Sequence, residues 1–145
     1  MIKAKHIRDK TVELLQSHPR AKVFNSQVTN IQQDELPVIC VYVKAENAEG
    51  REPNSAGFYI TYELTIDILV KADRTLSFDE TNWQNTVDEL EDFVTETLFT
   101  DETWVQLTDS IQGYTVEREI TDEGEYEMAL TTMTIVRDAY YSYQL

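Results

Sequence analysis

The chain has 145 residues and a formal net charge of −15, from 12 Lys and Arg against 27 Asp and Glu. This length fits one domain over residues 1–145, and the acidic balance argues against nucleic acid as the main ligand, because phosphate binding needs clustered cations. The single cysteine excludes an internal disulfide, and no stretch approaches the roughly 20 apolar residues of a membrane span, so we expect no membrane contact.

The charges are unevenly distributed along the chain. Residues 1–22 hold six cations and two anions, whereas the remaining residues hold six cations and 25 anions. A basic end and an acidic body favour head-to-tail contact between copies of the chain. The alternative is a solvated surface that only keeps the protein soluble.

Residues 2–16 are expected to form the first helix. Apolar residues and Thr11 recur at helical spacing along one stripe: Ile7, Thr11, Leu14 and Leu15. Lys3, Arg8 and Lys10 lie off this stripe and should face water or a partner. The helix should end at His18-Pro19, because the residue before proline is pushed out of the α region. Both histidines are too isolated for a metal site and are expected at the surface.

Two strands and a loop are expected next. Residues 22–28 give a short strand, and the apolar run Val38–Val43 is typical of a central strand buried on both faces. Cys40 within it should be a small buried hydrophobe. The polar stretch Glu46–Gly57 is longer than a hairpin loop of about 2–5 residues. It is interpreted either as a mobile loop that orders on contact with a partner or as plain disorder.

The stretch Phe58–Lys71 alternates with a period of two, which predicts a long strand with one apolar face. It should pair antiparallel with residues 38–44. Its other face is mostly polar and is a candidate interface, carrying Tyr59, Thr61, Glu63, Thr65 and Asp67.

A second helix should follow a capping box at Ser77–Glu80. Its apolar face is predicted from Trp83, Val87, Leu90, Val94 and Leu98, and its outer face carries Asp88, Glu89, Glu91, Asp92 and Glu96 without Lys or Arg. A carboxylate pair serves as general acid and base only where the environment separates the two pKa values. A solvated helix face does not do this, so these residues are not expected to be catalytic.

In the last third of the chain, residues 100–103 are expected to cap a short helical turn from which Trp104 and Leu107 pack inward, and two strands should follow. The strands cover residues 114–120 and 126–137 and are joined by a hairpin turn at 122–125. Alternation breaks near Thr131–Met133, which indicates either a bulge or burial on both faces. The tail, residues 139–145, holds three tyrosines and is interpreted either as an interface or as a frayed terminus.

Motifs of the common enzyme classes are missing from the sequence. It has no glycine-rich phosphate loop, no G-x-S-x-G, no H-E-x-x-H, no Cys/His cluster and no EF-hand spacing. The sequence therefore predicts a protein that is not an enzyme and that carries no metal or cofactor.

Three stretches in this order carry a family resemblance. They are Glu35–Tyr42, with proline before a hydrophobic strand; Glu63–Ile68, within a long strand after an acidic loop; and Gly113-Tyr114, opening the penultimate strand before a hairpin. Together they resemble the tail terminator family, minor tail protein U of lambda-like long-tailed phages. The resemblance covers nearly the whole chain, although its tyrosine-rich end is longer than the family pattern.

The resemblance implies an α+β (α/β) fold, with a single mixed, mostly antiparallel sheet of four to five strands and two main helices packed on it. It also implies a ring, typically of six copies, that caps the tail tube, stops its polymerisation and offers a surface to the head-tail connector protein. The expected partners are thus other copies of the chain, the major tail tube protein and the connector. The protein would assemble in the bacterial cytoplasm and reside in the virion tail, with no enzymatic activity.

Interface candidates follow from the basic first helix, the 46–57 loop and the polar face of the long strand. They are Lys3, Arg8, Lys10, Glu46, Glu49, Arg51, Glu52, Tyr59, Glu63 and Asp67. Two other functions stay open: another ring-forming neck or tail-completion protein, and an acidic inhibitor that mimics nucleic acid.

Overall fold

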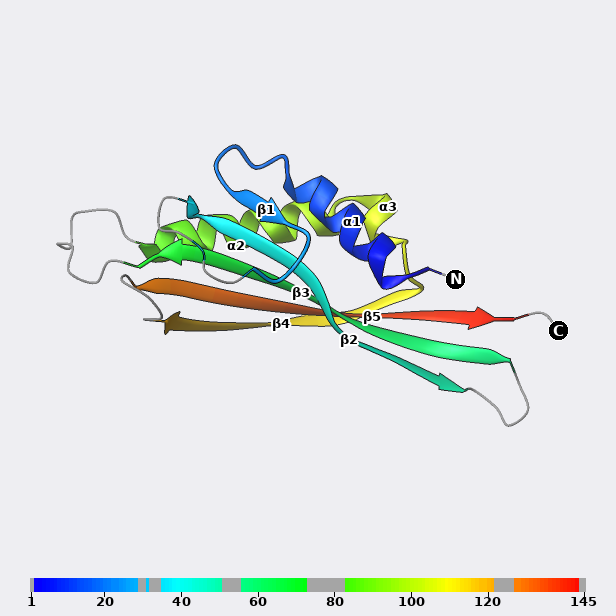
Figure 1. The fold of residues 1–145 in the computed structure, drawn as a ribbon. Helices are drawn as coiled ribbons and strands as arrows, with labels where there is room; N and C mark the ends of the chain where they lie inside the picture. The colour runs from blue at the N-terminus through cyan, green and yellow to red at the C-terminus, as the bar shows by residue number, and fades with distance from the viewer. Residues whose placement is uncertain are drawn as a thin grey trace.

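A computed structural model describes residues 2–28, 31, 35–50, 56–72, 83–121 and 127–143. These residues form one five-stranded sheet in the order β1-β2-β3-β5-β4, with the helices on one face (Figure 1). The helices are α1 (Ala4–Leu15), α2 (Trp83–Phe99) and α3 (Glu102–Val105), and the strands are β1 (Lys22–Phe24), β2 (Val38–Gly50), β3 (Gly57–Lys71), β4 (Ser110–Thr121) and β5 (Met128–Ser142). The expected α+β class is confirmed.

Strand β3 is the centre of the sheet, as its alternation predicts. It pairs antiparallel with β2 on one side, and with β5 over its whole length on the other, from Gly57 opposite Ser142 to Lys71 opposite Met128. Only β1 and β2 run parallel. Every second side chain of β3 from Ile60 to Val70 faces the helices. These side chains are buried with four residues of the predicted α2 stripe, Val87, Leu90, Val94 and Leu98, while its first residue, Trp83, is partly buried against them.

A second, smaller apolar cluster lies on the opposite face of the sheet. Its buried members are Ile31, Val38, Cys40 and Leu69. The first four residues of β2 are therefore buried on both faces, as the continuous apolar run predicts. Cys40 is 1% exposed, and burial raises the pKa of its thiol, so its predicted role as a buried hydrophobe is confirmed.

An arginine occupies a core position in β5. Arg137 is fully buried; its Nε donates to Thr108 Oγ1 at 2.8 Å, and one terminal nitrogen donates to the carbonyls of Trp104 and Val105 at 2.6 and 2.9 Å. Its guanidinium also lies 4.3 Å from the Trp104 ring centroid. Burial lowers the pKa of Arg137 to about 10. Because the carbonyls belong to the end of α3, Arg137 fastens this short helix to the sheet.

Trp104 extends this contact to the first helix. Its indole nitrogen donates to Thr11 Oγ1 at 2.8 Å, and Thr11 donates in turn to the carbonyl of Ile7 at 2.7 Å. The backbone amide of Trp104 bonds to the side chain of Asp101, which caps α3 as the sequence indicated for this turn. A chain of hydrogen bonds therefore joins β5, α3 and α1 inside the core.

The structure corrects the predicted loop at 46–57. Strand β2 continues to Gly50, which lies opposite Phe58, and a register shift between Val43 and Ala45 absorbs one residue. The polar residues 46–50 are in a strand because their backbone groups pair with β3, and this pairing does not depend on apolar side chains. Residues 51–55 lie outside the described residues.

The predicted tail also belongs to the sheet. Residues 139–142 continue β5 and pair with the first residues of β3. No register shift interrupts the β3–β5 ladder near Thr131–Met133, so the bulge considered there is absent from this ladder. The apparent break in alternation arises because polar residues, Thr131 and Arg137, occupy buried positions on the helix face. The capping box at Ser77–Glu80 and the turn at 122–125 lie outside the described residues.

His18 is buried, contrary to its predicted surface position, whereas His6 is exposed. The Nδ1 atom of His18 accepts hydrogen bonds from the amides of Arg20 and Ala21 at 3.1 and 3.0 Å, and the His18 ring contacts Phe93 edge-on. Burial and then the charge of Arg20 lower the pKa of His18, and Glu89 opposes them. A proton on Nδ1 would replace two hydrogen bonds with two repulsive contacts, so the fold favours the neutral imidazole.

We predict that replacing Arg137 lowers the free energy of unfolding, and that the loss is larger when the substitution leaves both a cavity and buried acceptors without this donor. Arg137→Ala should lower the free energy of unfolding by about 3–5 kcal/mol, because it leaves a cavity and removes the buried donor to Thr108, Trp104 and Val105. Arg137→Met fills the volume and should cost about 1–3 kcal/mol. Urea unfolding measures both values.

The control Arg118→Ala removes exposed ion pairs with Asp88 and Glu91 and should lower the free energy of unfolding by less than about 1 kcal/mol. Equal losses for Arg137→Ala and Arg118→Ala would contradict this assignment.

We predict that His18 makes the protein less stable as the pH falls. Below the unfolded-state pKa of 6.5 the unfolded chain binds a proton that the folded chain rejects, down to the lowered pKa of the folded state. The free energy of unfolding should therefore fall between pH 7 and pH 5, and His18→Gln should flatten this slope. His6→Gln, at the exposed histidine, should leave the slope as it is in urea titrations across this range.

Candidate functional site: the sheet arm

One end of the sheet projects beyond the helices, at the right of Figure 1. We call it the sheet arm and define it as residues 45–50 of β2, 57–63 of β3 and 138–142 of β5. The hydroxyl of Tyr62 donates to the carbonyl of Ile2 at 2.7 Å, so the start of α1 lies at the base of the arm. Strand β1 pairs only with Val38–Cys40, and β4 reaches only Asp138 of β5. No described strand therefore pairs with the outer edges of β2 and β5 along the arm beyond these residues, and the amide of Tyr140 on the β5 edge donates to the side chain of Asp109.

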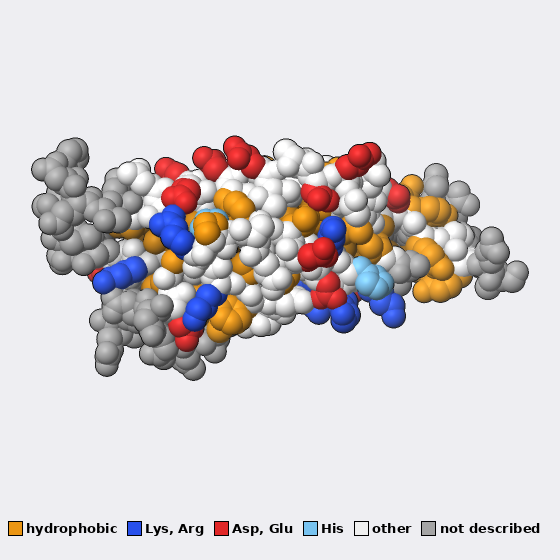
Figure 2. Space-filling view, turned by 90° about the horizontal axis from the view of Figure 1, so that it is seen from above, with side chains coloured by type: hydrophobic (Ala, Val, Ile, Leu, Met, Phe, Trp, Pro, Cys, Tyr) orange, Lys and Arg blue, Asp and Glu red, His pale blue; other side chains and the backbone are white. Residues whose placement is uncertain are grey.

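Aromatic side chains cover both faces of the arm. Phe58 and Tyr141 lie on the helix side and contact Tyr143, while Tyr59 and Tyr140 lie together on the opposite face with ring centroids 5.3 Å apart. Tyr59, Tyr140 and Tyr143 are 40–51% exposed. Figure 2 shows hydrophobic side chains gathered at this end of the molecule. Exposed clustered tyrosines are typical of protein interfaces, where a large ring and a polar tip both find contacts.

The arm is also acidic. It holds Glu46, Glu49, Glu63 and Asp138 and neither Lys nor Arg. Glu46 lies opposite Tyr62 and Glu49 opposite Tyr59, so the two glutamates point to different faces. A partner surface that covers the arm must therefore offer hydrogen-bond donors or cations to several carboxylates as well as apolar contacts to the rings.

A hollow of about 330 Å³ opens on the helix-free face of the arm. Its rim combines the Tyr59 and Tyr140 rings with three carboxylates, from Glu49, Asp109 and Asp138. Asp138 accepts from Thr61 Oγ1 at 2.8 Å and from Gln112, and Asp109 accepts from the amide of Tyr140 at 2.6 Å. These bonds hold two of the carboxylates in place, and the side chain of Glu49 is exposed beside them.

The structure brings together only some of the predicted site residues. Glu49 and Tyr59 meet in the hollow, Glu46 is exposed on the other face, and Glu63 is half-buried at the base of the arm. Arg51 and Glu52 lie outside the described residues. Sequence reasoning missed Asp109 and Asp138, and it considered Tyr140 only as part of a tyrosine-rich tail that was either an interface or a frayed terminus. Tyr140 and Asp138 belong to β5, and extending its alternation through residues 138–142 would have placed Tyr140 beside Tyr59.

The predicted cations of α1 do not form one patch. Lys3 and Lys10 are two turns apart and share one side of the helix, whereas Arg8 lies on the other side at about 100° per residue. Arg8 donates to Asn25 at 2.8 Å, and Lys10 lies 3.7 Å from Glu13. Lys3 is exposed at the start of the helix. Of the three, Lys3 is therefore the most accessible to a partner.

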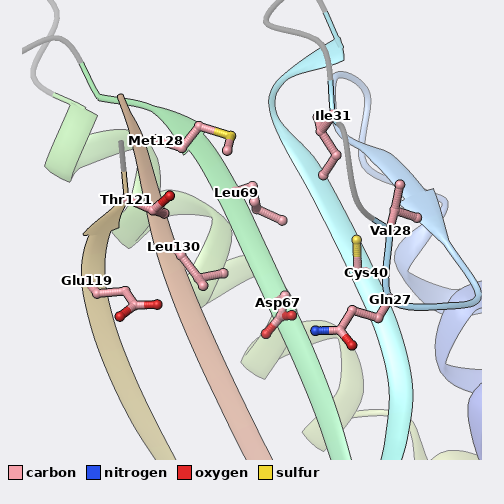
Figure 3. A pocket seen from close by; sticks show the side chains of 10 residues that line it. All are labelled: Gln27, Val28, Ile31, Cys40, Asp67, Leu69, Glu119, Thr121, Met128 and Leu130. Carbon is pink, nitrogen blue, oxygen red and sulfur yellow. The ribbon is translucent and has the colours of Figure 1, made fainter. Parts of the chain in front are cut away.

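Asp67 is buried, so the structure removes it from the candidate interface. It is 6% exposed and accepts from the Tyr42 hydroxyl at 2.9 Å and from Thr132 Oγ1 at 3.0 Å. It lines a hollow of about 320 Å³ on the helix-free face, with Gln27 and Glu119 nearby and apolar residues at the other end (Figure 3). Burial raises the pKa of Asp67, although Tyr42, Thr132 and Lys44 act in the opposite direction.

The acidic face of α2 is partly neutralised by cations from other elements. Arg118 of β4 pairs with Asp88 and Glu91, and Arg20 pairs with Glu89 at 2.7 Å. The sequence alone could not reveal these contacts, since Arg20 and Arg118 lie far from the helix along the chain. Because several of its carboxylates are already paired with arginines, this face of α2 is less suited to imitate a phosphate backbone than a face of unpaired carboxylates would be.

Two further classes of site were considered for the described residues. Within them, no group of three or more His, Cys, Asp or Glu side chains is placed to hold a metal ion. None of the described helices has both the length and the apolar character needed to cross a bilayer.

Comparisons with known proteins do not assign the chain to a family. No protein-family model matches it, and no curated protein matches it. The surfaces described above therefore carry the functional argument, together with the resemblance in the sequence.

We predict that Asp67 costs stability at neutral pH. From the unfolded-state pKa of 3.8 up to the raised pKa of the folded state, the unfolded chain releases the Asp67 proton while the folded chain retains it. The contribution of Asp67 to stability is thus fully present below pH 3.8 and is lost as the pH rises through the folded pKa. Asp67→Asn should keep partners for Tyr42 and Thr132 and should exceed the parent in stability at pH 7.

Urea unfolding from pH 4 to pH 7 measures this difference. The advantage of Asp67→Asn should grow with pH and then level off. The matched control Glu63→Gln lies on the same face of the same strand but is less buried, and it should show no such growth. An advantage that shrinks as the pH rises would contradict the burial argument.

Proposed function

We propose that the chain is a structural subunit of a long-tailed phage: a tail terminator, several copies of which form a ring on the end of the tail tube. The ring stops tube polymerisation and presents a surface to the head-tail connector protein. The ordered sequence stretches that resemble this family support the proposal, and so does the sheet arm. The expected ring size is six.

The sheet arm is the observation that carries this proposal. It combines exposed tyrosines on two faces, strand edges along which no described strand pairs, and four carboxylates. A projecting sheet of this kind offers a broad surface with exposed aromatic residues, which fits a protein partner better than a small molecule. Its paired strands also give the surface a fixed shape before contact.

Termination requires that one subunit contact two different partners. A tube end exposes the surface that the next tube subunit would occupy, and a ring bound there removes this surface from further addition. A closed ring needs heterologous contacts between unlike patches of neighbouring copies. The start of α1, with the exposed Lys3, and the acidic arm are unlike surfaces of this kind.

The two alternatives differ in their partners. A neck or tail-completion protein would bind the head connector without affecting tube length. A nucleic-acid mimic would present a continuous carboxylate face to a basic protein, and the pairs made by Arg20 and Arg118 on α2 disfavour this reading.

We predict that the chain, added to the polymerising tail tube protein of the same phage, shortens the tubes and binds at one end. Tube lengths and the end-bound label are measured by negative-stain electron microscopy. Tyr59→Ser, in the arm, should weaken this effect about tenfold in the concentration required, since central aromatic residues dominate interface energies. Tyr114→Ser is the matched control, because Tyr114 has a similar exposure, 47% against 44%, but lies outside the arm.

The outcome separates the three functions. Unchanged tube lengths with binding to the head connector would replace the proposal with the neck function. Binding to a DNA-binding protein, but to neither tail nor connector, would favour the mimic. Equal effects of the two tyrosine variants would remove the arm from the interface.

A further inference from the structure

We infer that the hollow on the helix-free face of the arm binds the first turn of α1 from a second copy of the chain. The ammonium group of Lys3 would enter between the tyrosine rings and the carboxylates. This inference deepens the proposed function, since it names the contact between neighbouring copies and rests on their association.

The chemistry of the hollow selects a cation with a long apolar stem. The Tyr59 and Tyr140 rings supply faces for a cation and apolar surface for its stem, while Glu49, Asp109 and Asp138 supply negative charge. A Cβ on Gly57 would overlap the Tyr140 hydroxyl, so glycine at this position gives the ring its place beside Tyr59. The side-chain amide of Asn47 donates to the carboxylate of Glu49 at 3.4 Å.

The first turn of α1 is the matching surface. The positive end of a helix dipole favours acidic side chains, yet this turn contains none and instead begins with Lys3 and Lys5. Lys5 lies 2.5 Å from Asp9 within the helix, whereas Lys3 is exposed at its start. Carboxylates from outside would offset both the lysine charge and the helix dipole at this end.

The two surfaces cannot meet within one chain. The helix lies on one face of the sheet and starts beside Tyr62, whereas Tyr59 and Glu49 point to the opposite face. The contact must therefore join two copies, each giving a different face to its neighbours. Such a contact is heterologous, so it continues from copy to copy until a ring closes or a filament grows.

Salt acts on this contact in two opposite ways. Copies at −15 each repel one another over long distances, and added salt screens this repulsion beyond a Debye length of about 8 Å at physiological ionic strength. A lysine that enters the hollow, with the rings on one side and the carboxylates on the other, is partly desolvated and is screened less. Association should therefore increase between low and physiological salt, and the variants should be compared at the latter.

The test is a charge-exchange experiment by sedimentation velocity on the full chain. Glu49→Lys alone and Lys3→Glu alone should each weaken self-association about tenfold or more, because each places like charges in contact. An equimolar mixture of the two variants should associate again, since each contact between unlike copies then pairs opposite charges. The double variant should associate again by itself for the same reason.

Matched controls separate the contact from net charge and from folding. Glu117→Lys makes the same change on an exposed glutamate of β4 outside the arm, and Lys22→Glu makes the same change on an exposed lysine of β1. Both controls should associate like the parent. All four substitutions are at exposed positions, and equal unfolding midpoints in urea show that the variants fold.

Three results would overturn the inference: association of Glu49→Lys or Lys3→Glu at the parental strength, a mixture that stays dissociated, or a parent chain that is monomeric at every protein and salt concentration. The tube assay separates this inference from the proposed function. Rings that form through this contact but ignore tube ends would refute the terminator function alone, whereas tube capping by both single variants would refute this contact alone.

Discussion

The ladder between β3 and β5 is the constraint on which the rest of the structure depends. Fifteen residues of each strand pair without a register shift, from Gly57 and Ser142 to Lys71 and Met128. A slip of one residue would move every side chain of one strand to the other face. Ile60, Tyr62 and Leu64 would leave the core, and Glu63 and Asp67 would enter it against the helices. The same register places Tyr140 beside Tyr59, so the apolar core and the proposed interface are fixed by a single pairing.

Arg137 shows how the helix layer is fastened to this ladder. An isolated buried guanidinium is costly, and the cost is offset here by hydrogen bonds to the end of α3 and by the face of Trp104. Trp104 then bonds to Thr11 of α1. Three elements far apart in the sequence thus share one polar network inside an apolar core. Such a network is specific in geometry, since every member must be correctly placed for the others to be satisfied.

The sequence predicts the elements whose side chains follow a simple period. Strand β3 and helix α2 are recognised because apolar residues recur at spacings of two and of three to four. Periodicity fails where a polar residue occupies a core position, as with Thr131 and Arg137. The burial of Arg137 depends on hydrogen-bond partners that lie in α3 and the turn that follows it. Periodicity also fails for residues 46–50, which are polar yet paired, because pairing is a property of two strands. The hollow on the arm was hidden for the same reason, since Glu49, Tyr59, Asp109 and Tyr140 come from four segments.

The placement of charge makes the two faces of the sheet unlike. The helix-free face of the arm gathers carboxylates around tyrosine rings, while cations are concentrated near the start of α1 on the opposite side of the sheet. Either surface alone is unfavourable: like charges are held together in the hollow, and lysines stand where the helix dipole is positive. Each is relieved by the other only in a neighbouring copy. The two complementary charges lie on opposite faces of one sheet and cannot reach each other within one copy. Under the proposed contact, electrostatic stabilisation therefore comes from association with neighbouring copies. Since every copy also repels the others through its net charge, the short-range contact must exceed this repulsion, and the geometry of the hollow decides which neighbour is accepted.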